Sequence, residues 1–186
     1  MRSEPGPIAQ PRPAAPEEVL TDRMILRRPV PGDLDELVVL LGDPRVGRWL
    51  GGVADHAGTA EMLGRWIAHW DALRFGLWCA RDRETGSLVG RGGLLATVVG
   101  GAGAIEAGWA IAPRRCGEGL ATELGAASIR VAERDLGVRE LVSFTLPDNL
   151  GSRRVMEKLG FAFAADVTHA GLPHVLYRRA SPPLRP

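Results

Sequence analysis

AIEAGWAIAPRRCGEGLAT, residues 104–122, joins a strand-like segment to a glycine-rich bend. The apolar part, 104–112, is typical of a strand and is ended by Pro113. The bend then opens a segment with helical periodicity. Unpaired N–H groups and a partial positive charge at the beginning of a helix favour a phosphate. The bend, Arg114–Thr122, is therefore predicted to hold a pyrophosphate group.

Three other interpretations of this bend compete. A connection without a ligand would also be rich in glycine, and the bend alone leaves this alternative open. A dinucleotide-binding loop, G-x-G-x-x-G/A, needs glycine or alanine where Thr122 stands. A P-loop needs a lysine, and the bend contains none. The pattern that remains is R-x-x-G-x-G/A, formed by Arg114, Gly117 and Gly119.

The composition is that of an ordinary globular domain. The 186 residues are 45% hydrophobic and 24% charged, and the net charge is +1. This balance disfavours nucleic acid and anionic membranes as partners. The sequence has neither the long apolar run of a membrane span nor the N-terminal apolar segment of a signal peptide.

Cysteine and histidine usage predicts a reducing compartment and no metal. Cys79 and Cys116 are far apart and form no C-x-x-C pair, which disfavours a disulfide framework or a zinc site. The four histidines form no ligand pair on one helix face. We therefore expect a cytoplasmic protein without a metal ion.

Both ends of the chain offer few side chains that a core could bury. Residues 1–18 are rich in proline and alanine and are expected to form a disordered tail. One folded domain is expected over 19–180, followed by a short C-terminal tail at 181–186.

Hydrophobic periodicity predicts an α+β domain. Strands are expected at 24–27, 76–81, 87–99, 104–112, 138–145, 161–167 and 172–178. Helices are expected at 34–41, 59–74, 117–134 and 150–159. Two successive antiparallel hairpin steps precede the bend, and a doubly wound parallel sheet would lack them. One strand–helix–strand crossover spans 104–145.

Side chains that begin helices are also predicted. Asp33, with Glu36 three residues later, has the spacing of a capping box. Asp43 before Pro44 marks the beginning of a further turn or helix. Thr59 is expected to cap the long helix that follows it.

The R-x-x-G-x-G/A pattern resembles the acetyl-CoA signature of the GNAT superfamily of N-acetyltransferases. IEAGWAI at 105–111 resembles the family strand before its loop, and LATEL at 120–124 resembles the helix after it. NLGSRRVMEKLGF at 149–161 nearly repeats the family segment N-x-x-S-x-x-v-x-x-K-L-G-F. LTDRMILRRP at 20–29 is similar to the branch that includes the ribosomal-protein N-terminal alanine acetyltransferases.

This resemblance implies the GNAT fold, a mixed and mostly antiparallel twisted sheet flanked by helices. It also implies that acetyl-CoA is a cosubstrate, and that an acetyl group passes directly to a primary amine in a ternary complex. The acceptor would be a small molecule or a protein N-terminus, and a homodimer is one expectation for the assembly. An acyl-CoA-binding regulatory protein without turnover is the alternative.

The resemblance also assigns coenzyme-binding residues. Pantetheine lies along the strand before the bend in this family, so the backbone groups of Trp109 and Ile111 are expected to bind it. Asn149 stands where the family places a coenzyme-binding asparagine. The predicted coenzyme-binding residues are Trp109, Ile111, Arg114, Arg115, Cys116, Gly117, Glu118, Gly119, Leu120, Ala121, Thr122, Asn149, Ser152 and Lys158.

Two residues are predicted to move protons. Glu106 is the expected base, acting directly or through water, and it also counts as an acceptor-binding residue. The alternative for Glu106 is a solvated carboxylate on a strand. Phe161–Phe163 occupies the region where many family members have a tyrosine acid, and Tyr177 is the only tyrosine. Ser152, the serine of N-x-x-S, is therefore the expected acid, and the alternative is a hydroxyl that bonds its own helix.

Tryptophans are divided between acceptor site and core. Trp49 lies between the first two predicted helices, where the family often shapes its acceptor site, and is predicted to line that site. Trp66 and Trp70 are four residues apart on a helix and are expected to pack in the core.

Overall fold

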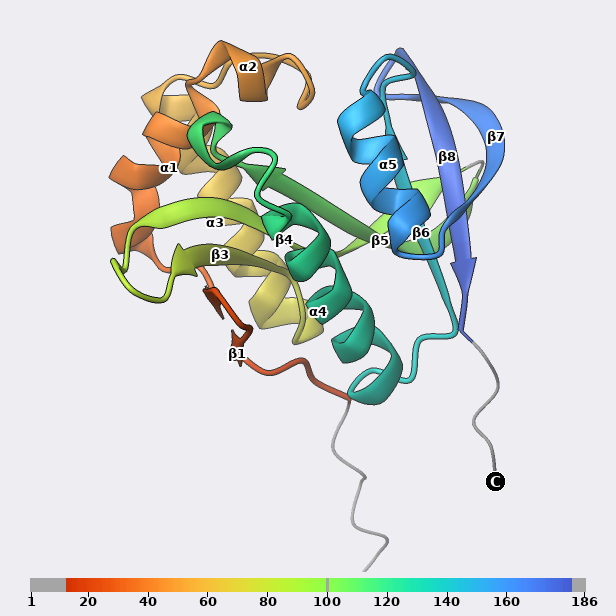
Figure 1. Ribbon diagram of the computed structural model, residues 1–186, viewed down its shortest axis with the longest axis horizontal. Helices are drawn as coiled ribbons and strands as arrows, with labels where there is room; N and C mark the ends of the chain where they lie inside the picture. The colour runs from red at the N-terminus through yellow and green to blue at the C-terminus, as the bar shows by residue number, and fades with distance from the viewer. Residues whose placement is uncertain (1–12, 100, 182–186) are drawn as a thin grey trace, which may run out of the picture.

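A computed structural model describes residues 13–99 and 101–181. Its centre is an eight-stranded sheet in the order β1-β2-β3-β4-β5-β6-β8-β7 (Figure 1). All neighbouring strands are antiparallel except β5 and β6, which confirms the mixed and mostly antiparallel sheet. The strands are β1 (Glu18–Leu20), β2 (Met24–Arg27), β3 (Leu77–Asp82), β4 (Leu88–Val99), β5 (Ala102–Ile111), β6 (Glu140–Thr145), β7 (Ala162–His169) and β8 (Leu172–Ala180).

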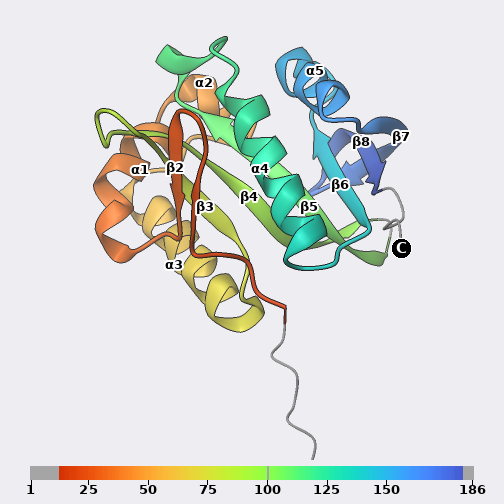
Figure 2. The ribbon, with the colours of Figure 1, turned by 60° about the horizontal axis from the view of Figure 1, so that its bottom comes forward.

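Helices cover both faces of this sheet. They are α1 (Leu34–Leu41), α2 (Pro44–Gly47), α3 (His56–Leu73), α4 (Leu120–Arg134) and α5 (Leu150–Lys158), with 3₁₀ helices η1 (Pro31–Asp33) and η2 (Pro113–Arg115). α1 and α3 pack on one face of the sheet around Leu77 and Cys79. α4 packs on the opposite face around Leu94 and Ala107 (Figure 2). The two faces therefore have separate apolar cores.

The contact between β5 and β6 is short. Their backbones pair only at Glu106 and Val142, whereas β5 pairs with β4 along its whole length. From Ala107 to Ile111, β5 therefore continues without a hydrogen-bonded neighbour on its β6 side. Because parallel strands end at the same edge of a sheet, the segments after β5 and after β6 lie at that edge together.

Most of the predicted elements are confirmed, with shifts of one to three residues at their ends. The helix expected at 117–134 begins at Leu120, because Gly117 and Gly119 have φ values of +89° and +84° and cannot lie in a right-handed helix. Trp66 and Trp70 are buried, as expected.

The predicted capping box of α1 is wrong. The Asp33 carboxylate instead accepts hydrogen bonds from the Val30 N–H and from the guanidinium groups of Arg27 and Arg81. Glu36 likewise accepts from Arg81. Burial alone would raise the pKa of Asp33, but these donors hold it below its usual value. Asp33 is thus the N-cap residue of α1, as predicted, but these contacts occupy both carboxylates in place of the α1 backbone N–H groups.

The cap expected for α3 is also wrong. Asp55 is the N-cap, and its carboxylate accepts from the Gly58 N–H at 2.7 Å. Thr59 lies inside the helix and is fully buried. The long helix therefore begins three residues before the predicted range of 59–74.

Part of the expected N-terminal tail packs on the domain. Ala15 is buried and its N–H donates to the Arg74 carbonyl oxygen, and the Pro16 carbonyl oxygen accepts from the Trp78 indole. Residues 13–18 therefore depart from the expectation of disorder, because they close the lower part of the α4-side core. The remainder of that expectation, and residues 182–186 of the C-terminal tail expected at 181–186, lie outside the described residues.

Candidate active site

The bend between β5 and α4 presents a row of free backbone N–H groups. Among the described residues, no protein group accepts a hydrogen bond from the N–H groups of Gly117 to Thr122. A side chain at Gly117 would meet nothing within 4 Å, and one at Gly119 would meet only Arg23 at 3.5 Å. Positive φ at both glycines turns successive N–H groups outward. This geometry fits an anion such as a pyrophosphate.

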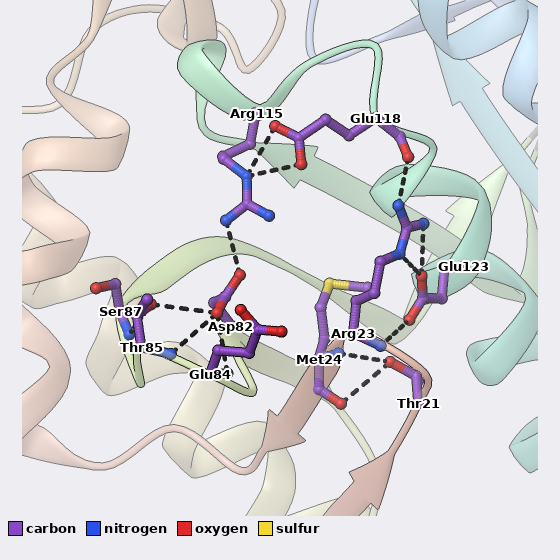
Figure 3. Close-up of polar contacts among 10 residues, drawn as sticks. All are labelled: Thr21, Arg23, Met24, Asp82, Glu84, Thr85, Ser87, Arg115, Glu118 and Glu123. Atoms are coloured by element: carbon purple, nitrogen blue, oxygen red, sulfur yellow. Dashed lines mark hydrogen bonds and ion pairs between the residues drawn. The ribbon is translucent and has the colours of Figure 1, made fainter.

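Two arginines, Arg23 from the β1–β2 turn and Arg115 within the bend, tie the bend to other elements (Figure 3). Arg23, in the turn between β1 and β2, donates from Nη1 to the Glu118 carbonyl oxygen at 2.6 Å. Its Nε and backbone N–H donate to the Glu123 carboxylate in the first turn of α4. Arg115 donates to the Glu118 carboxylate and to Asp82 at the end of β3. The bend is thus fixed to the β1–β2 and β3–β4 turns.

Arg114 and Arg115 are neighbours in the bend, but within the described part of the chain only the Arg115 side chain is held by ion pairs. The side chain of Arg115 is shared between two carboxylates, and its hydrogen bond lowers the pKa of Asp82 to about 2. Arg114 is exposed and has no ion pair among the described residues. Arg114 is therefore available to a ligand, whereas Arg115 holds the bend.

A groove of about 890 Å³ extends from the bend along α4. Gly119, Thr122 and Lys158 line it, and all three were predicted from the sequence. Its further cations are Arg23, Arg83 and Arg130. A groove of this size with several cations suits a ligand that carries more than one phosphate. Sequence patterns missed these three arginines, because they come from separate turns and from the exposed face of α4.

Trp109 and Ile111 lie on the part of β5 that has no β6 neighbour. On the other side, their backbones pair with Gly92 and Gly90 of β4. The Trp109 ring packs against Gly125, where a Cβ atom would come within 3.2 Å of it. This packing sets the distance between β5 and α4.

Glu106 lies at the point where β5 and β6 separate, on the face opposite α4. The side chain is half-buried, and burial raises the pKa of its carboxyl to about 7, although Arg91 opposes the shift. Gly108, two residues along the same face, leaves room beside the carboxylate. A carboxyl that is about half ionised near neutral pH is suited to general base catalysis.

Ser152 and Asn149 lie at the beginning of α5, after β6. The Asn149 side chain is buried, accepts from the Ser152 N–H and donates to the Thr145 hydroxyl. Asn149 therefore caps α5, a role that the sequence pattern did not show. The half-buried Ser152 hydroxyl has no hydrogen-bond partner among the described residues.

Tyr177 and Cys116 are held by contacts within the protein. The buried Tyr177 hydroxyl accepts from Arg153 and donates to Glu157, both on α5. The Cys116 thiol lies near the carbonyl oxygens of Ile111 and Ala112, and burial raises its pKa. Neither group has the arrangement of an acid or a nucleophile.

The acceptor side contains one predicted residue and one unexpected cluster. Trp49 is half-buried after α2 and stacks on Arg48 at 4.0 Å, so its role at the acceptor site stays a prediction. His169 and His174 meet across the β7–β8 hairpin beside Phe144, with 5.6 Å between the two imidazole centroids. Phe144 lies on a different strand from each histidine, so the sequence alone did not indicate this cluster.

A cluster of metal ligands and a membrane-spanning helix are both absent from the part of the chain that the structure describes. The residues that it describes contain no group of three or more histidine, cysteine or acidic side chains placed to bind a metal ion. Within the same residues, every helix is too short or too polar to cross a membrane.

Comparison with known proteins identifies the family. Residues 23–162 match the model of the acetyltransferase (GNAT) domain. The uncharacterised protein YkkB of Bacillus subtilis is 27% identical over 168 residues, which cover 90% of this chain and 98% of that protein.

Solved structures agree with this match. A protein assigned to the GnaT acetyltransferases of Bordetella pertussis has a TM-score of 0.78 and 27% identity, covering 89% of this chain and 100% of its own. The ribosomal-protein-S5-alanine acetyltransferase of Vibrio fischeri shares the fold (TM-score 0.72, 14% identity, 91% and 99% covered). So does the microcin C7 self-immunity acetyltransferase MccE, solved with acetyl-CoA and AMP (0.68, 14%, 86% and 93%). The chain belongs to the GNAT acetyltransferase family.

Proposed function

We propose that this protein transfers an acetyl group from acetyl-CoA to a primary amine, by direct attack within a ternary complex. The observation that carries the proposal is the position of Glu106. Its half-buried carboxyl lies on the strand that leads into the free N–H groups of the bend. This arrangement supports Glu106 as a base on the strand that leads to an anion site.

The coenzyme would be held mainly by the backbone. The N–H groups of Gly117 to Thr122 would bind the pyrophosphate, with Arg114 adding charge. The unpaired side of β5 at Trp109 and Ile111 would bind pantetheine. Lys158 and Arg130 would meet the nucleotide end along the groove. When bound, acetyl-CoA supplies an activated acyl group.

Proton transfer would involve two side chains of this protein. Glu106 would accept a proton from the acceptor amine, directly or through water. An α-amine has a pKa of about 7.7–8.0, so a carboxylate with a pKa of about 7 is matched to it. The free Ser152 hydroxyl would give a proton to the leaving thiolate. Among the described residues, this hydroxyl makes no hydrogen bond to the α5 backbone, which supports its assignment as the acid over a purely structural role.

The proposal also covers the class of acceptor, the cellular location of the protein and its assembly. Similarity of fold to the S5 alanine acetyltransferase supports a protein N-terminus as one acceptor, and a small amine is the other. Free Cys79 and Cys116 support a cytoplasmic location. A homodimer is retained as the proposed assembly on the basis of family resemblance alone.

A thiol-release assay tests the function. Purified protein is incubated with acetyl-CoA and a pooled panel of amines and N-terminal peptides, and coenzyme binding is measured in parallel. We expect thiol release that depends on the acceptor pool. Tight coenzyme binding without release across the whole panel would instead identify a regulatory acyl-CoA-binding protein.

A further inference from the structure

Arg91 is a half-buried cation without a protein hydrogen-bond acceptor among the described residues. It lies on β4 and faces α3, where its Cζ atom is 5.4 Å from the centroid of the Trp66 ring. Its Nε atom is buried without a hydrogen-bond acceptor, and no nitrogen of the guanidinium donates to protein among the described residues. A buried guanidinium N–H without an acceptor is costly, so this position favours an anion supplied by a ligand.

Glu106 shares the face of the sheet with Arg91. Arg91 pairs with Ala110, and Glu106 pairs with Leu95, two steps further along the same two strands. Between these pairs, Gly93 lies directly opposite Gly108. Side chains alternate along a strand, so Gly93 and Gly108 share this face. Gly93 is buried, and a Cβ atom there would clash with the Gly76 carbonyl oxygen, whereas a Cβ atom at the half-buried Gly108 would meet only the Glu106 carboxylate. Gly108 therefore leaves bare backbone beside that carboxylate.

The two charges influence each other without touching. Arg91 opposes the rise in the pKa of Glu106 that burial causes, and Glu106 opposes the fall that burial causes in the pKa of Arg91. No ion pair within 4.0 Å joins them in the part of the chain that the structure describes. The site therefore offers a negative and a positive group on one face of the sheet, with no side chain at Gly108 between them.

We infer that the acceptor is a free α-amino acid, whose carboxylate is bound by Arg91 while Glu106 receives the proton of its α-amine. This inference rests on the proposed acetyl transfer and narrows its acceptor. An α-amino acid carries its amine and carboxylate on one carbon atom, which matches two opposite charges placed on either side of Gly108. One guanidinium also matches the single charge of a carboxylate. A peptide N-terminus would place a neutral amide against Arg91.

The wild-type protein gives the first test. Thiol release is measured with each of the twenty amino acids and with the corresponding amino acid amides. We expect kcat/KM for the best acid to exceed that for its amide by about 100-fold or more, because a site built for a polar group strongly rejects an analogue without it. Equal values for acid and amide would overturn the inference while leaving acetyl transfer intact.

Arg91→Met gives the second test, with Arg91→Lys retaining the charge. Arg91→Met should raise KM for the acid at least about tenfold, as for the loss of a charge-assisted hydrogen bond, and should leave the amide unchanged. Arg91→Lys should recover part of the loss. Arg134→Met, at an exposed position on α4, is the matched control. Equal losses on acid and amide would identify a structural role and contradict the inference.

A binding measurement that needs no turnover distinguishes failure of this inference from failure of the proposed acetyl transfer. Thermal unfolding of the coenzyme A complex is followed with and without each amino acid. Stabilisation that Arg91→Met abolishes supports the carboxylate site, even where thiol release fails. Absence of both stabilisation and thiol release with every amino acid refutes it.

Discussion

The two sides of the sheet build their sites in different ways. On the α4 side, one continuous segment of chain forms the proposed anion site, and its free backbone N–H groups would carry the binding. On the α3 side, Arg91 and Glu106 of the proposed acceptor site come from separate strands and would act through their side chains. A site made by one segment leaves a motif in the sequence, whereas a site made by strand register does not. The donor side is therefore recognisable across a family, and the acceptor side is free to vary.

Gly119→Val should have the largest effect of these variants, and it tests whether the backbone of the bend binds the coenzyme. Its φ of +84° is costly for a β-branched residue, and the added atoms would enter the anion site. We expect coenzyme affinity to fall by at least about 100-fold, measured by equilibrium binding, since both the strain and the lost N–H groups oppose it. Gly137→Val, at φ +66° near the other end of α4, is the control for strain alone. Comparable loss of affinity in both variants would argue against an anion site at Gly119.

Glu106→Gln tests the chemistry at the boundary between the two sides. About 10–20% of an α-amine is already neutral at pH 7, so we expect kcat/KM to fall only by about 10- to 100-fold. Because the carboxylate form is the base, wild-type activity should rise with pH through about 7, and the variant should lose that limb. A loss above about 10⁴-fold in kcat would contradict an α-amine acceptor, since such an amine needs little help.

Arg115→Ala sharpens the distinction between backbone and side chain on the donor side. Arg115 bonds Asp82 and Glu118, so its loss should loosen the bend and weaken coenzyme binding about tenfold, or about 1–2 kcal/mol. Asp82→Asn should give a loss in the same direction, because it removes the other end of the brace. If Arg115→Ala weakens binding and Asp82→Asn does not, Arg115 contacts the phosphate directly.

Ser152→Ala should have the smallest effect. A thiol with a pKa near 8.5 leaves without much help, so we expect kcat to fall by about tenfold or less. Solvent isotope effects on kcat would check whether proton delivery has become slower. An unchanged kcat would leave water as the proton donor and remove Ser152 from the proposed mechanism.

Sequence patterns predicted local features well and long-range ones poorly. The bend and the succession of helices and strands along the chain follow from periodicity and short motifs, which record neighbours in sequence, and Glu106 follows from the family resemblance. The capping box of α1 was wrong because Arg81, 45 residues from Glu36, takes its carboxylate. The braces of the bend were missed because Arg23 is 95 residues from Glu118. Such contacts depend on which strands become neighbours, and no spacing rule encodes that.

The single paired position between β5 and β6 has a mechanical consequence. Strands β1 to β5 and strands β6 to β8 form two parts of the sheet, and the one paired backbone position between them joins Glu106 and Val142. A ligand that bonds the free side of β5 would add a further connection at the boundary between β5 and β6. Amide hydrogen exchange at Val142 and its β6 neighbours should therefore slow when the coenzyme binds, although these residues lie outside the anion site. The boundary between β5 and β6 is therefore where coenzyme binding would change the dynamics of residues outside the donor site.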